Sequence, residues 1–506
     1  MSPVDPPRLL VANRGEIALR LIRGARDEGW RSIAVFSEAD RFAPHVGLAD
    51  EAYCIGPAPS NESYLRIPNL LEAARLGRAT HVHPGYGFLS ENPALPDACT
   101  EAGLGFIGPP AAAMRAMGDK VSARAAAERA GVPVLPGSPP LPDDVDLALR
   151  AAEQIGYPVL LKAAFGGGGK GMRLCATPEE VRKNLVLTRG EAARAFGNDA
   201  IFLERAVVNP RHIEIQLLCD RQGAAIHLGE RECSIQRRHQ KLIEEAPSPI
   251  LDAATRDAMG QAAVRLALAI GYENAGTCEF LLASDGRFYF LEMNTRLQVE
   301  HPVTELVTGI DLVRAQLRIA LGQPLPWRQE EIVTRGAAIE VRLCAEDPLR
   351  QFAPASGTIT YARLPQGPGV RNDAAVETGS EVPVHYDSML GKLIAWGATR
   401  EEARTRLVRA LDECVIEGVA TNLPFQRWAL RHPAFIAGAL HTGFVEEHFR
   451  PEALLHPDDS ELTSILAVIA AWRERERPAT MERARVVGSS PSGSAWRRAH
   501  GWKNRG

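Results

Sequence analysis

The fold class is decided by the stretch Leu9-Leu10-Val11-Ala12-Asn13-Arg14-Gly15. Its first four residues form a short apolar run typical of a buried strand, and the residues from Gly15 to Gly24 have helical periodicity. A second apolar run, at residues 32–36, follows within the distance that a strand–helix–strand unit requires. The turn after the first strand is not G-x-G-x-x-G, so the dinucleotide fingerprint is absent, but a layered α/β fold is expected.

Outward from this unit, the chain divides into four blocks. A loop at residues 83–92 closes the first block, and a proline-rich segment at residues 133–142 has the composition of a hinge. The third block has more strand-like runs, and the last ends in a Gly/Ser linker composition. The predicted domains are residues 1–115, 116–330 with a mobile lid at about 134–207, 331–450, and a helical extension with a linker tail at 451–506.

The composition excludes several classes of protein. Of the 506 residues, 45% are apolar and 24% are charged, which is ordinary for a globular chain and excludes a disordered or collagen-like one. The net charge of −4 gives no basic field for nucleic acid. The longest apolar stretch, around residues 465–472, is far below the roughly 18 residues of a membrane span. The eight cysteines lack a C-x-x-C pair, and the first residues lack a signal sequence, so we expect a cytoplasmic protein.

Lysine is rare in this chain, because only seven of the 58 basic residues are lysine. A lysine that persists against this preference for arginine is a candidate for a role that needs a compact ammonium group. Chance explains Lys183 and Lys503, which lie outside any motif. The other five, at positions 120, 162, 170, 241 and 392, lie within motif-like segments.

A glycine cluster at residues 166–171 follows an apolar run that contains Lys162. Four successive glycines allow main-chain N–H groups to approach a phosphate closely. The P-loop pattern fails, because it would need glycine at Ala164 and Ser or Thr at Gly171. The segment predicts two strands joined by a flexible loop, and a plain loop without a ligand remains an alternative.

Two strands at residues 276–282 and 287–294 are predicted to form a hairpin with acidic residues. If Asp285-Gly286 forms a two-residue type I′ turn, Glu279 and Glu292 lie directly opposite each other. Asn294 then points to the same face. Facing carboxylates are destabilising unless a cation lies between them, and Mg²⁺ prefers such oxygen ligands. The alternative is a solvated outer face.

Two charged segments suggest binding of a small anion. Arg296 and Glu300, directly beyond the hairpin, could bind and deprotonate an oxyanion, or could form an ordinary ion pair. The run at residues 236–241 contains three cations and a histidine, but Glu244 and Glu245 follow it. This pattern favours a focused site for a small anion over a patch for a polyanion.

Together these segments resemble the biotin carboxylase family of the ATP-grasp superfamily. The resemblance covers about residues 8–450 and implies a Rossmann-like N-terminal domain, an ATP-grasp core with a glycine-rich lid, and a biotin carboxylase C-terminal domain. It implies ATP-dependent carboxylation of biotin on a separate carrier, with bicarbonate as the carbon source. The matching runs are residues 12–18, 83–92, 117–120, 166–172, 236–241, 292–303 and 386–389.

The resemblance also implies which residues bind the nucleotide and its metal. Two lysines contact the ATP phosphates, two glycines close over them, a hinge holds the adenine edge, and polar side chains line the pocket. In that order these are Lys120 and Lys162; Gly168 and Gly169; Glu204, Arg205, Ala206 and Val207; and His212, Gln236 and His239. The residues implied for Mg²⁺ or Mn²⁺ are Glu279, Glu292 and Asn294.

The family's chemistry assigns the remaining residues. Lys241, Arg296 and Val299 form the bicarbonate site, and Glu300 deprotonates bicarbonate for attack on the γ-phosphate, which gives carboxyphosphate. Arg296 then stabilises an enolate-like biotin, and Arg342 helps to bind bicarbonate and biotin. The implied partners are a biotin carboxyl carrier protein and carboxyltransferase subunits, in a homodimer or a larger complex.

Two features depart from the family pattern. Phe165 stands where many relatives have a small residue at the entrance of the glycine loop. No Ala-Met-Lys-Met biotin attachment motif occurs, so the carrier is expected on another polypeptide, or the chain is a truncated one. The tail at residues 494–502 resembles the point where acyl-CoA carboxylase α subunits pass into their next domain, which implies such an α subunit, complete or truncated. The alternative functions are another ATP-grasp ligase that forms an acyl or carbamoyl phosphate, and a non-catalytic ATP-binding subunit.

Overall fold

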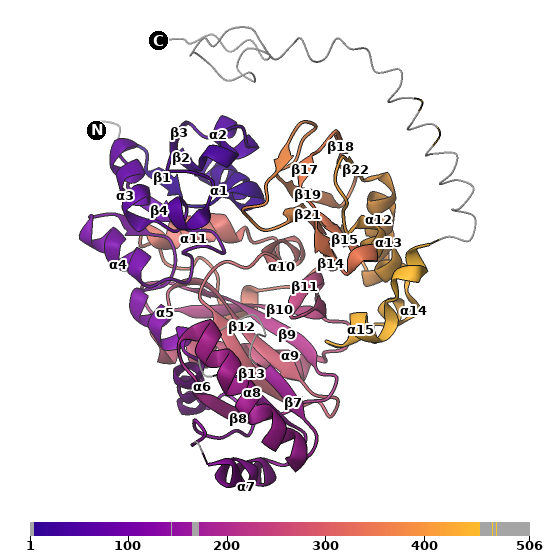
Figure 1. Ribbon diagram of the computed structural model, residues 1–506. Helices are drawn as coiled ribbons and strands as arrows, with labels where there is room; N and C mark the ends of the chain where they lie inside the picture. Colours follow the sequence, from indigo (N-terminus) through magenta and orange to yellow (C-terminus); the bar gives the residue numbers. More distant parts are fainter. Residues whose placement is uncertain (1–4, 143, 164–171, 456–467, 469–471, 473–506) are drawn as a thin grey trace, which may run out of the picture.

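A computed structural model describes residues 5–142, 144–163, 172–455, 468 and 472 (Figure 1). The glycine cluster, Phe165 and nearly all of the predicted helical tail lie outside the described residues. Among the described residues, no helix combines the length and the apolar composition needed to cross a bilayer.

The N-terminal part forms a parallel sheet with the strand order β3-β2-β1-β4-β5. This sheet confirms the α/β fold class predicted from residues 9–36, with the first strand, helix and second strand at the predicted positions. The strands are β1 (Arg8–Val11), β2 (Arg31–Phe36), β3 (Glu51–Cys54), β4 (His81–His83) and β5 (Gly105–Phe106). The helices are α1 (Gly15–Asp27), α2 (Pro44–Leu48), α3 (Ile67–Leu76) and α4 (Ala94–Glu101).

An eight-stranded sheet forms the centre of the molecule, with the order β13-β12-β9-β10-β11-β14-β21-β19. Its first five strands precede residue 330 and its last three follow it, so one sheet crosses the expected domain boundary. The strands before the boundary are β9 (Arg211–Cys219), β10 (Ala225–Arg237), β11 (Gln240–Ala246), β12 (Asn274–Leu282) and β13 (Phe288–Asn294). Those after it are β14 (Ala337–Cys344), β19 (Val370–Ala374) and β21 (Met389–Gly397).

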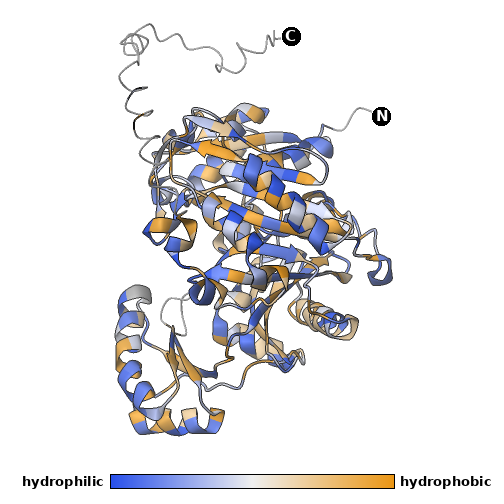
Figure 2. Cartoon of the chain, turned by 90° about the vertical axis from the view of Figure 1, so that its right-hand side faces the viewer, coloured by the Kyte–Doolittle hydropathy of each residue, from blue (hydrophilic) through white to orange (hydrophobic). Residues whose placement is uncertain are grey.

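The part predicted to be a lid forms a separate small layer at the bottom of Figure 1 and stands out as its own lobe in Figure 2. Its sheet has the order β7-β6-β8, from β6 (Val159–Ala163), β7 (Met172–Cys175) and β8 (Ile201–Arg205). Helices α7 (Val145–Ile155) and α8 (Pro178–Phe196) pack on it around their own apolar core. Strands β6 and β7 therefore confirm the two strands predicted around the glycine loop.

The remaining helices cover the central sheet and its C-terminal extension. They are α5 (Ala111–Gly118), α6 (Lys120–Arg129), α9 (Ala253–Ala269), α10 (His301–Thr308), α11 (Leu312–Ala320), α12 (Arg400–Glu413), α13 (Leu423–Arg431), α14 (Pro433–Ile436) and α15 (Phe444–His448). The short strands are β15 (Glu346–Asp347), β16 (Ala353–Pro354), β17 (Gly357–Thr358), β18 (Tyr361–Arg363), β20 (Glu381–Val382) and β22 (Val415–Glu417).

Candidate active site

The β12–β13 hairpin brings its two acidic residues together as predicted, but by a different turn. Glu279 lies directly opposite Glu292 in the ladder. The two-residue type I′ turn is wrong, because the main-chain N–H of Ala283 donates to the carbonyl of Arg287 at 2.8 Å. Three residues therefore form the loop, and Gly286 adopts a φ of 83° in it.

A β-bulge at Leu291 compensates for the wider turn. Phe280 pairs with Phe290, whereas Glu279 pairs with Glu292, so Leu291 has no partner in the ladder. The bulge turns Phe290 toward the apolar core, where it lies at the edge of the Phe280 ring. Glu292 can then face the site although it is two residues from Phe290.

Four charged residues form a row across the central sheet. Glu292 on β13 lies opposite Glu279 on β12, Glu279 lies opposite Glu214 on β9, and Glu214 lies opposite Arg231 on β10. Arg231 is fully buried and donates to the Glu214 carboxylate. Directly paired residues on neighbouring strands project to the same face, so this row forms one wall of the site.

Lys241 on β11 joins three carboxylates of this region. Its ammonium donates to Glu279 at 2.7 Å, to Glu300 at 2.7 Å, and to Glu214. Burial alone would lower the pKa of Lys241, but the three carboxylates raise it well above its ordinary value. Lys241 is therefore a fixed cation at the centre of the site.

Glu300 is fully buried between two cations. Lys241 binds one carboxylate oxygen, and Arg342 on β14 binds the other at 3.0 Å. Burial raises the pKa of Glu300, but Lys241, Arg342 and Arg231 more than offset this effect and hold it well below its ordinary value. Glu300 is thus an ionised carboxylate whose proton affinity depends on where its two cations point.

Arg296 does not pair with Glu300, so the simple ion pair considered as an alternative is not formed. Its guanidinium donates to Glu91 at 3.0 Å, to the Gln298 amide at 3.0 Å and to Asn294 at 3.1 Å. Glu91 belongs to the loop at residues 83–92, so this contact joins the N-terminal sheet to the site.

The residues expected to bind ATP form a second group. Lys162 on β6 pairs with Glu204 on β8, and Lys120 is the first residue of α6. Burial, and next the charge of Lys162, lowers the pKa of Lys120. Nε2 of His212 lies 3.0 Å from the Glu279 carboxylate, which connects this group to the acidic row.

Of the other expected nucleotide residues, two lie outside the described part of the chain. Gln236 is buried on β10 opposite Lys241, and His239 lies in the exposed turn that follows. The pKa of His239 is lowered by partial burial and by the charges of Lys162, His212 and Lys120, while Glu446 opposes them. Arg205 ends β8, with Ala206 and Val207 directly after it, and Gly168 and Gly169 lie outside the described residues.

The acidic hairpin fits a divalent cation. Glu292 keeps an exposed face, and both the burial of its surroundings and the facing charge of Glu279 raise its pKa. A cation between the two carboxylates would remove this repulsion. Asn294 lies beside them, with its amide nitrogen 2.8 Å from Glu279 and its oxygen 3.1 Å from Arg296. Its oxygen would have to exchange Arg296 for a cation to become a ligand.

Several residues of the site were missed in the sequence. Glu214 and Arg231 hold Lys241 and the acidic row, and Glu91 and Gln298 hold Arg296. A signal for Glu214 exists on β9, where His212, Glu214 and Gln216 alternate with apolar residues, as on a strand with one polar face. The ladder contacts of Arg231 are non-local and leave no such pattern.

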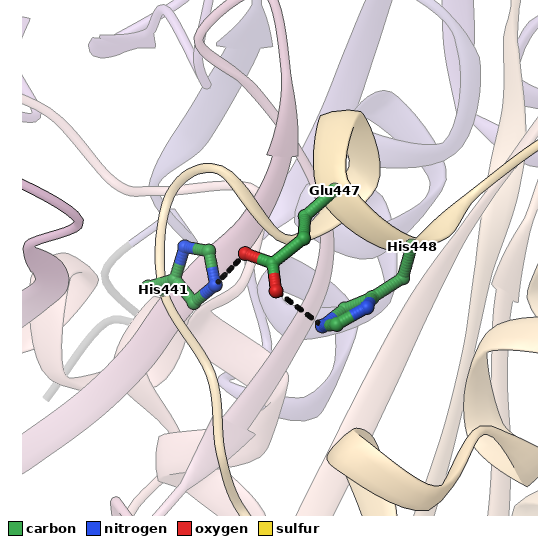
Figure 3. A group of neighbouring side chains, drawn as sticks. All are labelled: His441, Glu447 and His448. Carbon is green, nitrogen blue, oxygen red and sulfur yellow. Dashed lines mark ion pairs between the residues drawn. The ribbon is translucent and has the colours of Figure 1, made fainter.

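A second cluster of possible metal ligands lies in the C-terminal part, at His441, Glu447 and His448 (Figure 3). Nε2 of His441 is 3.1 Å from Glu447, and Nε2 of His448 is 3.7 Å from it. The main-chain N–H of Gly443 donates to Nδ1 of His441 at 3.2 Å, so a neutral His441 carries its proton on Nε2. In the structure both histidines lie in ion-pair contact with Glu447, and a metal ion could bind Nε2 of His441 only if that nitrogen lost its proton.

The chain matches three family models. Residues 6–114 match "Biotin carboxylase, N-terminal domain", residues 119–328 match "Carbamoyl-phosphate synthase L chain, ATP binding domain", and residues 340–447 match "Biotin carboxylase C-terminal domain". It is 52% identical over 440 residues to a biotin carboxylase from Nostoc sp., which covers 87% of this chain and 98% of that relative. It is 48% identical over 501 residues to the propionyl-CoA carboxylase alpha chain of Ruegeria pomeroyi, over 95% of this chain and 73% of the relative.

Solved structures show the same similarity. The biotin carboxylase domain dimer of the 2-oxoglutarate carboxylase of Hydrogenobacter thermophilus, in complex with MgADP, ADP and bicarbonate, superposes with a TM-score of 0.84 at 45% identity. That match covers 89% of this chain and 98% of the other. A biotin carboxylase from Campylobacter jejuni, in a βγ-ATP complex, gives a TM-score of 0.84 at 45% identity, over 87% of this chain and 98% of the other.

Proposed function

The chain belongs to the biotin carboxylase family, and from this premise we propose which of its residues perform each step of the reaction. The enzyme is an ATP-dependent ligase that carboxylates biotin with bicarbonate. The observation that supports the assignment is the set of three contacts made by Lys241, because the ammonium of Lys241 lies beside the carboxylate of Glu300, the proposed base.

The nucleotide is proposed to bind between the lid and the acidic hairpin. Lys120 and Lys162 supply positive charge for its phosphates, and Gly168 and Gly169 close over them. Glu204, Arg205, Ala206 and Val207 hold the adenine, while His212, Gln236 and His239 line its pocket. Glu279, Glu292 and Asn294 would hold Mg²⁺, or alternatively Mn²⁺, which neutralises phosphate charge when it is bound.

Bicarbonate is proposed to bind beside Lys241, Arg296 and Val299. In the substrate-free site, Lys241 and Arg342 hold Glu300 ionised. When these cations turn toward the bicarbonate anion, they stabilise Glu300 less, and its proton affinity rises. Glu300 can then take the bicarbonate proton while the bicarbonate oxygen attacks the γ-phosphate, which forms carboxyphosphate and releases ADP.

The carboxyl transfer needs a second set of contacts. Carboxyphosphate releases CO₂, the remaining phosphate takes the N1 proton of biotin, and N1 of the biotin anion then attacks CO₂ to give carboxybiotin. Arg296, which Glu91 and Gln298 hold in place, stabilises the enolate-like biotin, and Arg342 helps to bind bicarbonate and biotin. The lid excludes water from the labile intermediate when it closes.

The partners and the location complete the proposal. We assign the chain to the biotin carboxylase component of an acyl-CoA carboxylase, because its similarity to a propionyl-CoA carboxylase alpha chain extends over 95% of its length. It works with a biotin carrier, a carboxyltransferase and a second copy of itself. Its eight cysteines form no disulfide, which supports a location in the reducing cytoplasm.

The assay of this proposal measures ADP release with MgATP, bicarbonate and free biotin, with each omitted in turn. Turnover should require both bicarbonate and biotin. Glu300→Gln should lower kcat by at least about 100-fold, since general-base groups contribute about that much. Glu38→Gln, the same change at an exposed carboxylate, is the matched control and should leave the rate unchanged.

The other outcomes separate the alternatives. Turnover that ignores biotin would identify a different ATP-grasp ligase. Tight MgATP binding without any turnover, alone or with the carrier protein, would identify a non-catalytic subunit. Full activity of Glu300→Gln would remove Glu300 from the role of base.

A further inference from the structure

Lys392 is fully buried on β21, and the proposed mechanism gives it no role. Its ammonium donates to the main-chain carbonyl of Val299 at 2.5 Å and lies 3.3 Å from the Glu16 carboxylate. Glu16 belongs to α1 of the N-terminal part, Val299 follows the acidic hairpin, and Lys392 belongs to the C-terminal part. One side chain therefore joins the three parts of the chain at the site.

Lys392 and Arg342 are neighbours across the β14–β21 ladder. They lie directly opposite each other, so their side chains project to the same face of the sheet. Arg342 holds the carboxylate of Glu300 at 3.0 Å, and Lys392 holds the carbonyl of the preceding residue, Val299. The pair thus fixes one side chain and the adjacent main chain of the same short segment.

The N-terminal loop at residues 83–92 reaches this segment from its other side. Tyr86 donates to the Glu16 carboxylate, and the centre of its ring lies 5.9 Å from the Lys392 ammonium. Glu91, from the same loop, binds Arg296. The segment from Arg296 to Glu300 is therefore held at both ends by contacts that include the N-terminal part.

The environment of Lys392 is costly for a structural lysine. A buried ammonium loses its hydration, and neither carboxylate oxygen of the neighbouring buried Glu340 has a hydrogen-bond partner in the described residues. An apolar side chain here, together with a neutral one in place of Glu16, would fill the same space without this cost. Arginine is much more frequent than lysine in this chain. Its wide planar guanidinium would not fit as well where the compact ammonium of Lys392 donates to one carbonyl.

We propose that Lys392 is a positioning residue that fixes the Val299 carbonyl and, through it, the Glu300 carboxylate in the bicarbonate site. The inference rests on the proposed function for the role of Glu300, but the anchoring itself is a property of the chain. The two parts can be measured separately.

The test compares Lys392→Met with Lys183→Met, the same substitution at an exposed lysine of α8. Amide hydrogen exchange of residues 296–303 should become at least about tenfold faster in Lys392→Met, which is the expected result of losing a hydrogen bond from a charged donor. Exchange in β9, and in Lys183→Met throughout, should not change. Unchanged exchange of residues 296–303 in Lys392→Met would overturn the proposal.

Kinetics test the consequence for catalysis. Lys392→Met should lower kcat by about tenfold and raise the KM for bicarbonate, while the Kd for MgADP stays within about twofold. A wild-type enzyme without biotin-dependent turnover would refute the proposed function, whereas the exchange result would still decide the anchoring. An equal loss of MgADP affinity would indicate general disruption and count against positioning.

Lys392→Met leaves the Glu16 carboxylate buried without its cation and could therefore misfold. Two further variants test the proposal in that case. Glu16→Gln/Lys392→Met removes both charges and should show the same fast exchange at residues 296–303. Glu16→Gln alone keeps the bond to the Val299 carbonyl and should exchange like the wild type there. If Glu16→Gln matched Lys392→Met, the ion pair and not the carbonyl contact would hold the segment, and the inference would be wrong.

Discussion

Most of the carboxylates in the site form an ion pair with a lysine or an arginine, and Glu292 is the exception among the described residues. Glu214, Glu279 and Glu300 all bind Lys241, and Glu300 also binds Arg342. Within the part of the chain that the structure describes, no ion pair is found for Glu292. The repulsion between Glu292 and Glu279 is therefore only partly offset in the free protein, by the charge of Lys120, and the remainder is available to strengthen binding of a cation.

Glu292→Gln should consequently stabilise the free protein. Removing one of two facing charges should raise the free energy of unfolding by about 0.5 kcal/mol, because like charges directly opposite in a ladder cost about that much. The Tm rise produced by MgADP should become smaller, since the cation loses a ligand. Thermal unfolding with and without MgADP measures both effects, and a lower Tm of the free variant would contradict the prediction. Glu279→Gln is the contrast, because it removes a partner of Lys241 and should destabilise the free protein.

Glu16 should make stability depend on pH near neutrality. Burial, with a smaller contribution from Asp373, raises its pKa to about 7, although Lys392 and Arg371 oppose this shift. A raised pKa means that folding takes up a proton between the ordinary pKa, about 4.5, and about 7, so stability falls as pH rises through that window.

The matching variant for this effect is Glu16→Gln, which cannot titrate. Between pH 5.5 and 7, the wild type should lose on the order of 1–2 kcal/mol of stability relative to Glu16→Gln, and the difference should level off above pH 7. Urea unfolding of both proteins across this range provides the measurement. A wild type that gains stability relative to the variant as pH rises would show that the pKa is not raised.

At the scale of elements, the β12–β13 hairpin shows what sequence alone can predict. The prediction of the opposed pair Glu279 and Glu292 is confirmed, but the turn that led to it is wrong. The three-residue loop shifts the pairing of the two strands by one residue, and the bulge at Leu291 shifts it back by one residue. The two changes cancel. Phe290 and Glu292 are two residues apart, so in a regular strand their side chains would face the same side. The bulge is needed because Phe290 is buried in the core. That burial depends on tertiary packing, which the sequence does not show.

The hairpin between β10 and β11 was not predicted at all. Its turn consists of Arg238 and His239, with φ values of 50° and 65°. Arginine rarely adopts this conformation, and the Asn-Gly or Asp-Gly pair typical of such turns is absent, so the sequence gives no turn signal there. Its charges instead predicted an anion site, and the two strands are held in place by the rest of the sheet.

The conformation of Gly286 gives a test at this scale. Gly286→Ala should destabilise the protein by about 1 kcal/mol, because φ is 83° and a side chain there meets no neighbour, so only backbone strain acts. Gly47→Ala is the control at an exposed position of α2 without positive φ, and it should be neutral or slightly stabilising. Chemical denaturation of both variants decides, and equal stability would show that the loop can rearrange.

For the whole molecule, the central sheet determines how the chain unfolds. Strand β11 pairs with β14 across the expected boundary at residue 330, and Ile235, Leu242 and Ile243 belong to the core cluster of the C-terminal part. The sequence predicted the blocks but not their shared sheet, because the pairing joins residues that are distant in the chain and is set by packing.

A fragment of residues 5–330 should therefore not fold on its own. It would expose the β11 edge and the three apolar side chains that the C-terminal part covers, and both favour aggregation. Gel filtration and far-UV circular dichroism should show aggregated or partly folded material, and co-expression with residues 331–455 should restore solubility. A monomeric fragment with a cooperative unfolding transition would contradict this expectation.

The proposed lid, unlike the C-terminal part, has a sheet of its own and does not share the central sheet. The chain enters and leaves it through two adjacent segments, where the N–H of Arg205 donates to the carbonyl of Pro136 at 2.8 Å and Gly137 bridges to Glu204. Cutting at these neighbouring points would remove one self-contained piece with its own core. The proposed lid can thus be exchanged between relatives as one piece at these two joints, without redesigning the remaining scaffold.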